Sequence, residues 1–167
     1  TLYSHAVSLR DLGCTQSPMN AWITLNGVET LPLRMERHVG NAQKVAGFLQ
    51  QHSSVEWVSY AGLSSSPYYQ LAQKYLQGKA GSVFTFGIRG GYESGLRLLE
   101  KVELFSHVSN IGDSRSLILH PASTTHRQLS DEQRLTAGAG PEVIRLSVGI
   151  ESAEDLIADL EQALELS

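Results

Sequence analysis

Arg145 is the residue whose type and position say most about chemistry. It lies in a run of six residues, Val-Ile-Arg-Leu-Ser-Val, at positions 143–148. In a strand, this alternation would place Arg145 and Ser147 on one face and the apolar residues on the core face. A guanidinium on a rigid strand can donate two parallel hydrogen bonds to a carboxylate. Taken alone, the run favours a simpler alternative, an exposed arginine paired with a neighbouring acid.

Histidine and cysteine side chains are the usual ligands of a structural metal ion. The six histidines show no paired helical spacing, and the single cysteine, Cys14, stands far from them in the sequence. We therefore expect no metal site. Without a disulfide partner, Cys14 is expected to be a small buried apolar residue. The histidines are His5, His38, His52, His107, His120 and His126.

Two other kinds of catalytic motif are missing. The glycine-rich residues 87–91 lack the spacing of a phosphate-binding loop and are expected to form a turn. Serine, histidine and aspartate are numerous, but no Gly-x-Ser-x-Gly motif is present to anchor a hydrolase triad. Residue types alone therefore assign no catalytic group.

Hydrophobic periodicity predicts the elements that must position these residues. Helices are expected at 18–25, 34–51, 67–76 and 92–102, after the capping box that begins at Ser130, and after the cap at Ser152. Strands are expected at 55–60, 82–88, 104–110, 116–120 and 143–148. The connections between 104 and 120 are too short for crossover helices, so part of the sheet must be antiparallel. The pattern predicts an α+β fold, a small, largely antiparallel sheet with helices packed against it.

Composition narrows the class of protein. The chain has 167 residues, 41% hydrophobic and 18% charged, which is typical of a folded domain. Its net charge is -4 and its basic residues are scattered, so nucleic acid is not an expected partner. The apolar runs are too short to span a bilayer, and we expect a cytoplasmic protein. Because the chain starts at Thr1, we expect a fragment or a processed chain.

Two segments, residues 109–126 and 143–151, closely resemble the C-terminal signature of the cystathionine synthase and lyase family. These are the Cys/Met-metabolism pyridoxal-phosphate enzymes of fold type I. Residues 9–18 and 29–38 are similar to the connecting region of the same family, and 155–160 to its closing helix. The resemblance covers nearly the whole chain.

The resemblance implies a division of labour between two domains. Family members have a large domain that binds pyridoxal phosphate through a lysine, and a small C-terminal domain that closes over it. We expect residues 1–50 to be a connecting helical segment and 51–167 to be the small domain, with the large cofactor-binding domain absent. None of the four lysines lies in the family's cofactor motif. The resemblance therefore places no catalytic and no cofactor-binding residue in this chain, and the fragment alone is expected to be inactive.

The same resemblance implies three substrate-binding residues. Arg145 matches the arginine that grips the α-carboxylate of the amino-acid substrate. Asn110 stands where many relatives have a serine, and its amide could donate the same hydrogen bond. Thr125 matches a threonine near the substrate pocket, although a turn-stabilising hydroxyl is an equal alternative. His120 and His126 are expected to serve packing and loop hydrogen bonding.

Within the family, Ser109, Asn110 and the Ser-Thr-Thr run at 123–125 are most similar to the O-acetylhomoserine sulfhydrylase group. This similarity implies γ-replacement of acetate by sulfide or a thiol, giving homocysteine, in a full-length transferase. The same portion of a cystathionine γ-synthase or methionine γ-lyase is an alternative, and a non-catalytic ligand-binding or interaction module is another. The resemblance also implies that the small domain works with its own large domain, and that the intact enzyme is a homo-oligomer, a dimer or tetramer.

Overall fold

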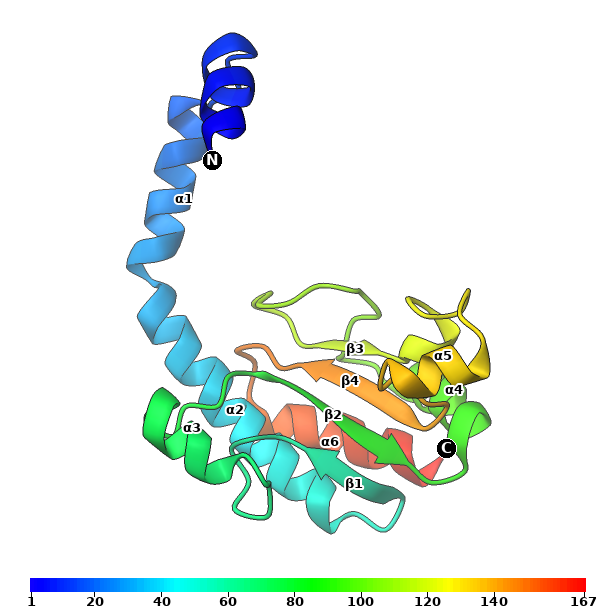
Figure 1. Ribbon diagram of the computed structural model, residues 1–167. Helices are drawn as coiled ribbons and strands as arrows, with labels where there is room; N and C mark the ends of the chain where they lie inside the picture. The colour runs from blue at the N-terminus through cyan, green and yellow to red at the C-terminus, as the bar shows by residue number, and fades with distance from the viewer. The chain divides into compact units, whose positions relative to one another are not determined.

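The computed structural model describes all residues, 1–167, and divides the chain into two compact units, Thr1–Leu33 and Arg34–Ser167. The first unit contains a π-helix, η1 (Ser4–Asp11), and an α-helix, α1 (Pro18–Glu29), both drawn in blue in Figure 1. Ser17 caps α1 by accepting a hydrogen bond from the Asn20 amide, as predicted. Cys14 is exposed, so the expectation that it would be buried was wrong.

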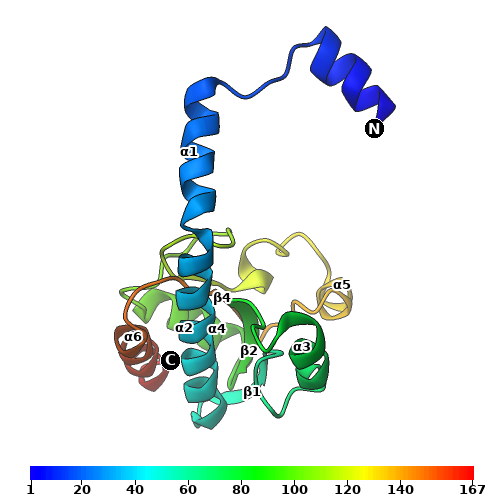
Figure 2. The ribbon, with the colours of Figure 1, turned by 90° about the vertical axis from the view of Figure 1, so that its left-hand side faces the viewer.

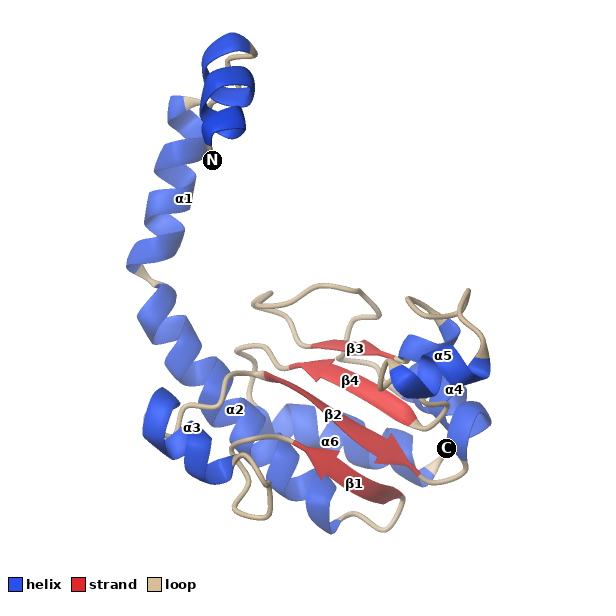
Figure 3. Ribbon diagram, in the orientation of Figure 1, coloured by secondary structure: helices blue, strands red, loops and turns tan.

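The second unit is built on a four-stranded sheet. Its strands are β1 (Val55–Ser59), β2 (Val83–Ile88), β3 (Leu117–Leu119) and β4 (Val143–Ser147). They lie in the order β1-β2-β4-β3, and each neighbouring pair is antiparallel. Figure 3 shows this sheet in red among the blue helices. The predicted α+β class with a small antiparallel sheet is therefore confirmed.

Three helices supply the apolar side chains that pack on the sheet. They are α2 (Leu31–Gln51), of which the part from Arg34 onward belongs to this unit, α4 (Gly91–Lys101) and α6 (Ala153–Glu165). Figure 2 shows α2 and α6 beside each other. The core joins residues of these helices to the inward side chains of the strands, and its fully enclosed members include Leu49, Phe86, Leu98, Ile118, Ile144, Leu146, Leu156 and Leu160.

One predicted strand, at residues 104–110, does not form. This segment contributes only an isolated parallel bridge between Ser106 and Leu117. The reason lies in α6, where the buried carboxylate of Asp159 accepts hydrogen bonds from three consecutive amides, at Glu103, Leu104 and Phe105. Because these amides are bound by a side chain, they are not available to a strand ladder.

Three short helices complete the second unit. They are α3 (Tyr69–Leu76), the 3-10 helix η2 (Pro121–Ser123) and α5 (Asp131–Thr136). The capping box predicted at Ser130 is present, with reciprocal hydrogen bonds to Gln133. The predicted start of α3 was too early, because the hydroxyl of Ser66 accepts the amide of Tyr68 in a turn before the helix begins. No helix of the chain combines the length and the apolar character needed to cross a membrane.

Candidate functional site

Arg145 lies in the middle of β4, between two neighbouring strands. It pairs with Thr85 of β2 on one side and with Leu119 of β3 on the other. The flanking residues Ile144 and Leu146 are fully buried in the core, whereas Arg145 is half-buried. The predicted core positions Ile144 and Leu146 are therefore confirmed, but Val143 and Ser147 on the other face are buried as well. The backbone of a central strand fixes the direction in which the Arg145 side chain leaves the sheet.

The guanidinium of Arg145 has no acidic partner. Its Nη2 donates to the backbone carbonyl of Asn110 at 3.1 Å, and no ion pair of the structure includes it. A guanidinium has five N–H donors, so most of its hydrogen-bonding capacity is unused by the protein. The simpler alternative, an arginine paired with a neighbouring acid, does not describe this residue.

Arg145 and Asn110 meet at one cavity. This cavity of about 270 Å³ is lined by Ser109, Asn110, Ile111 and Arg145. The side-chain oxygen of Asn110 accepts the amide of Ile111 at 2.9 Å, which leaves the Nδ2 group of Asn110 as a donor without a protein partner. Two nitrogen donors with spare capacity thus lie at a single opening, an arrangement suited to a carboxylate.

The loop that carries Asn110 is held to the end of β4 by polar contacts. The hydroxyl of Ser147 accepts the Gly112 amide at 3.3 Å. Beyond the strand, the Glu151 carboxylate accepts from the Ser116 amide at 2.7 Å and from the Ser116 hydroxyl at 2.9 Å. The hydroxyl of Ser116 in turn accepts the Gly149 amide at 2.8 Å. These contacts position Asn110 relative to Arg145, and no local sequence pattern points to Ser116 or Glu151 in this role.

Thr125 is not brought to this cavity. Its hydroxyl lies 2.8 Å from Nδ1 of His126 on an exposed loop. The neighbouring Thr124 bonds to the carbonyl of His120 at 2.7 Å, so local hydroxyl contacts organise this turn. A substrate contact from Thr125 remains a prediction.

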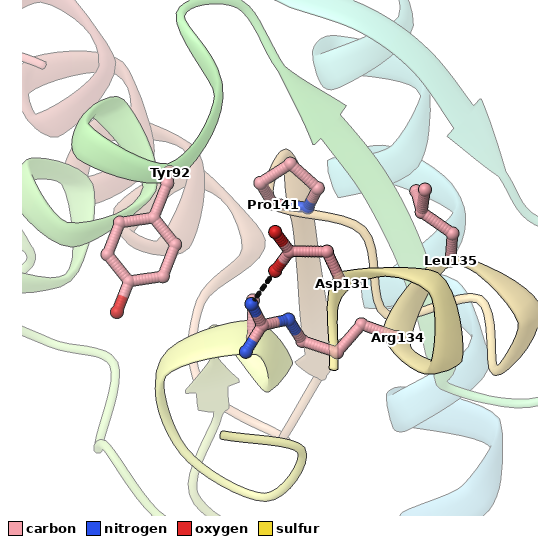
Figure 4. A pocket seen from close by; sticks show the side chains of 6 residues that line it. Tyr92, Asp131, Arg134, Leu135 and Pro141 are labelled. Carbon is pink, nitrogen blue, oxygen red and sulfur yellow. Dashed lines mark hydrogen bonds and ion pairs between the residues drawn. The ribbon is translucent and has the colours of Figure 1, made fainter. Parts of the chain in front are cut away.

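A larger cavity, of about 400 Å³, lies between α4, η2 and α5. Figure 4 shows Arg134 and Asp131 of α5 paired with each other at this cavity, beside Pro141, with Tyr92 of α4 on the other side. Because Arg134 already pairs with Asp131, its charge is neutralised within the protein. The smaller cavity at Arg145 is therefore the better candidate for recognising an anionic substrate.

His120 is a buried structural residue beside the larger cavity. Its Nε2 lies 2.9 Å from the Pro141 carbonyl and its Nδ1 lies 3.0 Å from the Ser123 hydroxyl. The ring packs edge-on against Tyr92, with centroids 5.1 Å apart. A carbonyl can only accept, so Nε2 carries the proton in the neutral ring. Both ring nitrogens are occupied by the protein, which fits the packing role expected from the sequence.

Burial lowers the pKa of His120, and the hydrogen bond to the Pro141 carbonyl offsets part of this effect. Neutral His120 therefore stabilises the fold fully above the ordinary histidine pKa of about 6.5, and this contribution is lost as the pH falls below it. We expect the urea concentration at the midpoint of unfolding to be lower at pH 5.5 than at pH 7.5. The difference between the two pH values should be smaller in the His120→Asn variant than in the unaltered protein. An equal drop in both proteins would contradict this assignment.

Known proteins similar to this chain point to one family. The family model for Cys/Met metabolism PLP-dependent enzymes matches residues 2–165. The O-acetyl-L-homoserine sulfhydrylase of Leptospira meyeri is 52% identical over 164 residues, which are 98% of this chain and 37% of the relative. O-acetyl-L-homoserine sulfhydrylase 1 of Thermus thermophilus is 51% identical, over 93% of this chain and 37% of the relative. The chain thus spans little more than a third of these relatives.

A fission-yeast protein and a solved structure agree with this result. The homocysteine synthase of Schizosaccharomyces pombe is 45% identical over 96% of this chain and 37% of its own length. The solved structure is from Campylobacter jejuni, of a protein named as an O-acetylhomoserine (thiol)-lyase with N'-pyridoxyl-lysine-5'-monophosphate. It is 46% identical, has a TM-score of 0.89, and is matched over 98% of this chain and 39% of its own. The chain therefore belongs to the Cys/Met-metabolism family of pyridoxal-phosphate-dependent enzymes.

Proposed function

We propose that this chain is the substrate-binding C-terminal portion of an O-acetylhomoserine sulfhydrylase. The whole enzyme would be a transferase that replaces the acetate of O-acetylhomoserine by sulfide or a thiol, giving homocysteine. The observation that carries the proposal is the guanidinium of Arg145, which opens into a cavity without any acidic partner. The names of the similar proteins from Leptospira and Thermus support this substrate class.

The proposed task of this site is orientation of the substrate. Arg145 would hold the α-carboxylate by paired hydrogen bonds, and the free Nδ2 group of Asn110 would add a donor. Fixing the carboxylate sets which bond at Cα stands ready for reaction, so these residues act by positioning. Thr125 is proposed as a third residue that contacts the substrate, and its loop would make this contact when the substrate is bound.

The lysines of this chain do not fit a cofactor site. All four are exposed, and none lines a described cavity. Lys44 pairs with Glu154 at 3.0 Å, and the ammonium of Lys74 lies 4.9 Å from the centre of the Tyr75 ring. We therefore assign binding of pyridoxal phosphate to a large domain outside these residues. In the whole enzyme, the cofactor would supply the electron-withdrawing chemistry that this chain lacks.

The expected domain division belongs to the same proposal. A connecting segment, expected at 1–50, would lead into the small domain, expected at 51–167. The compact unit that begins at Arg34 supports giving the last part of this segment to the small domain. Inactivity of the fragment alone, a cytoplasmic location and homotetrameric assembly of the whole enzyme are proposed with it.

A direct assay of the full-length protein tests the proposal. Incubation with O-acetylhomoserine and sulfide is expected to yield homocysteine and acetate in equal amounts, and the reaction should require added or bound pyridoxal phosphate. Two further assays measure the other activities of the family. The first replaces sulfide by cysteine and detects cystathionine, and the second supplies methionine and detects an α-keto acid. If either of these activities exceeds homocysteine synthesis in kcat/KM, the substrate assignment is wrong.

A further inference from the structure

We propose that Asn41 is a positioning residue for the carboxylate site at Arg145 and Asn110. Asn41 is buried in the second unit, and it acts on the site through residues 148–151, which lead from β4 toward α6. This segment is called the β4 connection below. The inference rests on the proposed function, to which it adds a residue that sets the geometry of substrate binding without contacting the substrate.

Two buried side chains bind the carbonyl oxygens of the β4 connection. The Nδ2 group of Asn41 donates to the carbonyl of Gly149 at 3.0 Å and to that of Glu151 at 2.8 Å. Nδ1 of His38 lies 2.6 Å from the carbonyl of Val148. Since a carbonyl can only accept, both hydrogens of the Asn41 amide are committed to this connection. Asn41 is 2% exposed and His38 is 1% exposed, so water does not compete easily for these carbonyls.

The opposite side of the β4 connection binds the loop that carries Asn110. The carboxylate of Glu151 accepts from the amide and the hydroxyl of Ser116, and the amide of Gly149 donates to the same hydroxyl. A Cβ on Gly149 would overlap the carbonyl oxygen of Ser114, so only glycine lets the two segments approach this closely. Gly149 and Glu151 are thus bound to Asn41 on one side and to the Asn110 loop on the other.

This arrangement refers both donors of the carboxylate site to one segment. Arg145 lies three residues before the β4 connection on the same strand, and Asn110 is tied to the connection by its loop. Without Asn41, two carbonyls of the connection lose their donors, and the separation of the two site residues is no longer fixed. Such a change removes neither donor, but it misplaces one relative to the other, which weakens recognition of a carboxylate by both together.

Two small probes separate carboxylate positioning from general damage to the protein. Glycine has an amino group and a carboxylate, whereas methylamine has the amino group alone. Titration of the visible absorbance of the full-length protein, loaded with pyridoxal phosphate, gives the Kd of each probe. In Asn41→Ala we expect glycine to bind about 3-fold to 30-fold more weakly, with methylamine binding unchanged. Unaltered glycine binding, or equal weakening of both probes, would overturn the proposal.

Gln43→Ala is the matched control on the same helix. Its Nε2 donates to the carbonyl of Gly62 at 3.0 Å, so this variant also removes an amide-to-carbonyl hydrogen bond, but away from the β4 connection. The ratio of the two Kd values should stay as in the unaltered protein. A ratio shifted as much as in Asn41→Ala would assign the effect to loss of any polar contact of this helix, and would contradict the proposal.

A second variant keeps the test decisive if Asn41→Ala does not fold. Glu151→Gln retains the backbone carbonyl that Asn41 binds, but it presents an NH₂ group to the donors of Ser116. We expect the same selective loss of glycine binding. If Glu151→Gln binds glycine normally, the β4 connection does not set the geometry of the site.

Arg145→Ala, titrated with the same probes, distinguishes failure of this inference from failure of the proposed function. If Arg145→Ala binds glycine as tightly as the unaltered protein, the carboxylate site itself is wrong, and the proposed function loses the observation that carries it. If Arg145→Ala weakens glycine binding while Asn41→Ala and Glu151→Gln do not, the site is upheld and only the positioning role of Asn41 is overturned.

Discussion

Replacing Arg145 by alanine in the full-length protein is expected to lower kcat/KM for O-acetylhomoserine by about 30-fold to several thousand-fold. This range corresponds to about 2–5 kcal/mol, the usual effect of truncating one partner of a desolvated charge pair. The loss follows from geometry: the guanidinium is half-buried on a central strand and bound only to a carbonyl, at 3.1 Å. Steady-state kinetics with varied O-acetylhomoserine at saturating sulfide measures it.

Two controls make the result specific to carboxylate binding. The visible absorbance of bound pyridoxal phosphate should be unchanged in Arg145→Ala, because the arginine is assigned to substrate and not to cofactor. Arg145→Lys keeps the charge but loses the planar fork, so it should recover only part of the activity. An alanine variant with unaltered kcat/KM would remove Arg145 from the site. Loss of cofactor absorbance would mean that the residue acts on the cofactor domain.

The strand positions of this fold could be read from local patterns. Alternating apolar residues at 82–88 and 143–148 predicted β2 and β4, and the buried residues Phe84, Phe86, Ile144 and Leu146 lie on the core face as expected. Caps at Ser17, Ser130 and Ser152 marked helix starts correctly. These signals succeed because each depends on residues only a few positions apart.

The errors arose where distant residues decide the local structure. The segment at 104–110 alternates like a strand, but the carboxylate of Asp159 on α6, more than fifty positions away in the chain, accepts the hydrogen bonds of its first two amides, at Leu104 and Phe105. Cys14 was expected to be buried from its residue type, yet it belongs to a unit in which few side chains are covered. Periodicity carries no information on such contacts.

The candidate site was predictable in part. The strand run identified Arg145, and its resemblance to the family added Asn110, which the fold brings to the same cavity. The anchors of the Asn110 loop were missed, because Ser116 and Glu151 are common polar residues whose contact depends on the turn after β4. Only the three-dimensional structure shows that Arg145 has no acidic partner. This absence distinguishes a candidate binding residue from an arginine that takes part in a surface ion pair.

The largest effect on stability is expected at Asp159, through the amides that it holds. Its carboxylate accepts the amides of Glu103, Leu104 and Phe105 at 2.8, 2.9 and 3.2 Å. The residue is only 8% exposed, so water cannot easily replace these bonds after truncation. Asp159→Ala would leave three amides without their acceptor, and the bond to the amide of Phe105 is buried. An unsatisfied buried donor costs more than the net value of the bond itself. We expect a loss of about 2–4 kcal/mol in the free energy of unfolding.

Denaturant titration of the full-length protein checks this expectation, with Glu161→Ala as the matched control. Glu161 is an exposed acid on the same helix, so its removal should change stability by less than about 0.5 kcal/mol. Asp159→Asn keeps one acceptor oxygen but turns a donor NH₂ toward the amides, and should recover only part of the loss. If Asp159→Ala resembles the control, the 103–105 amides are satisfied by water. The segment that leads from α4 toward the Asn110 loop would then owe its position to the isolated bridge at Ser106 instead of to α6.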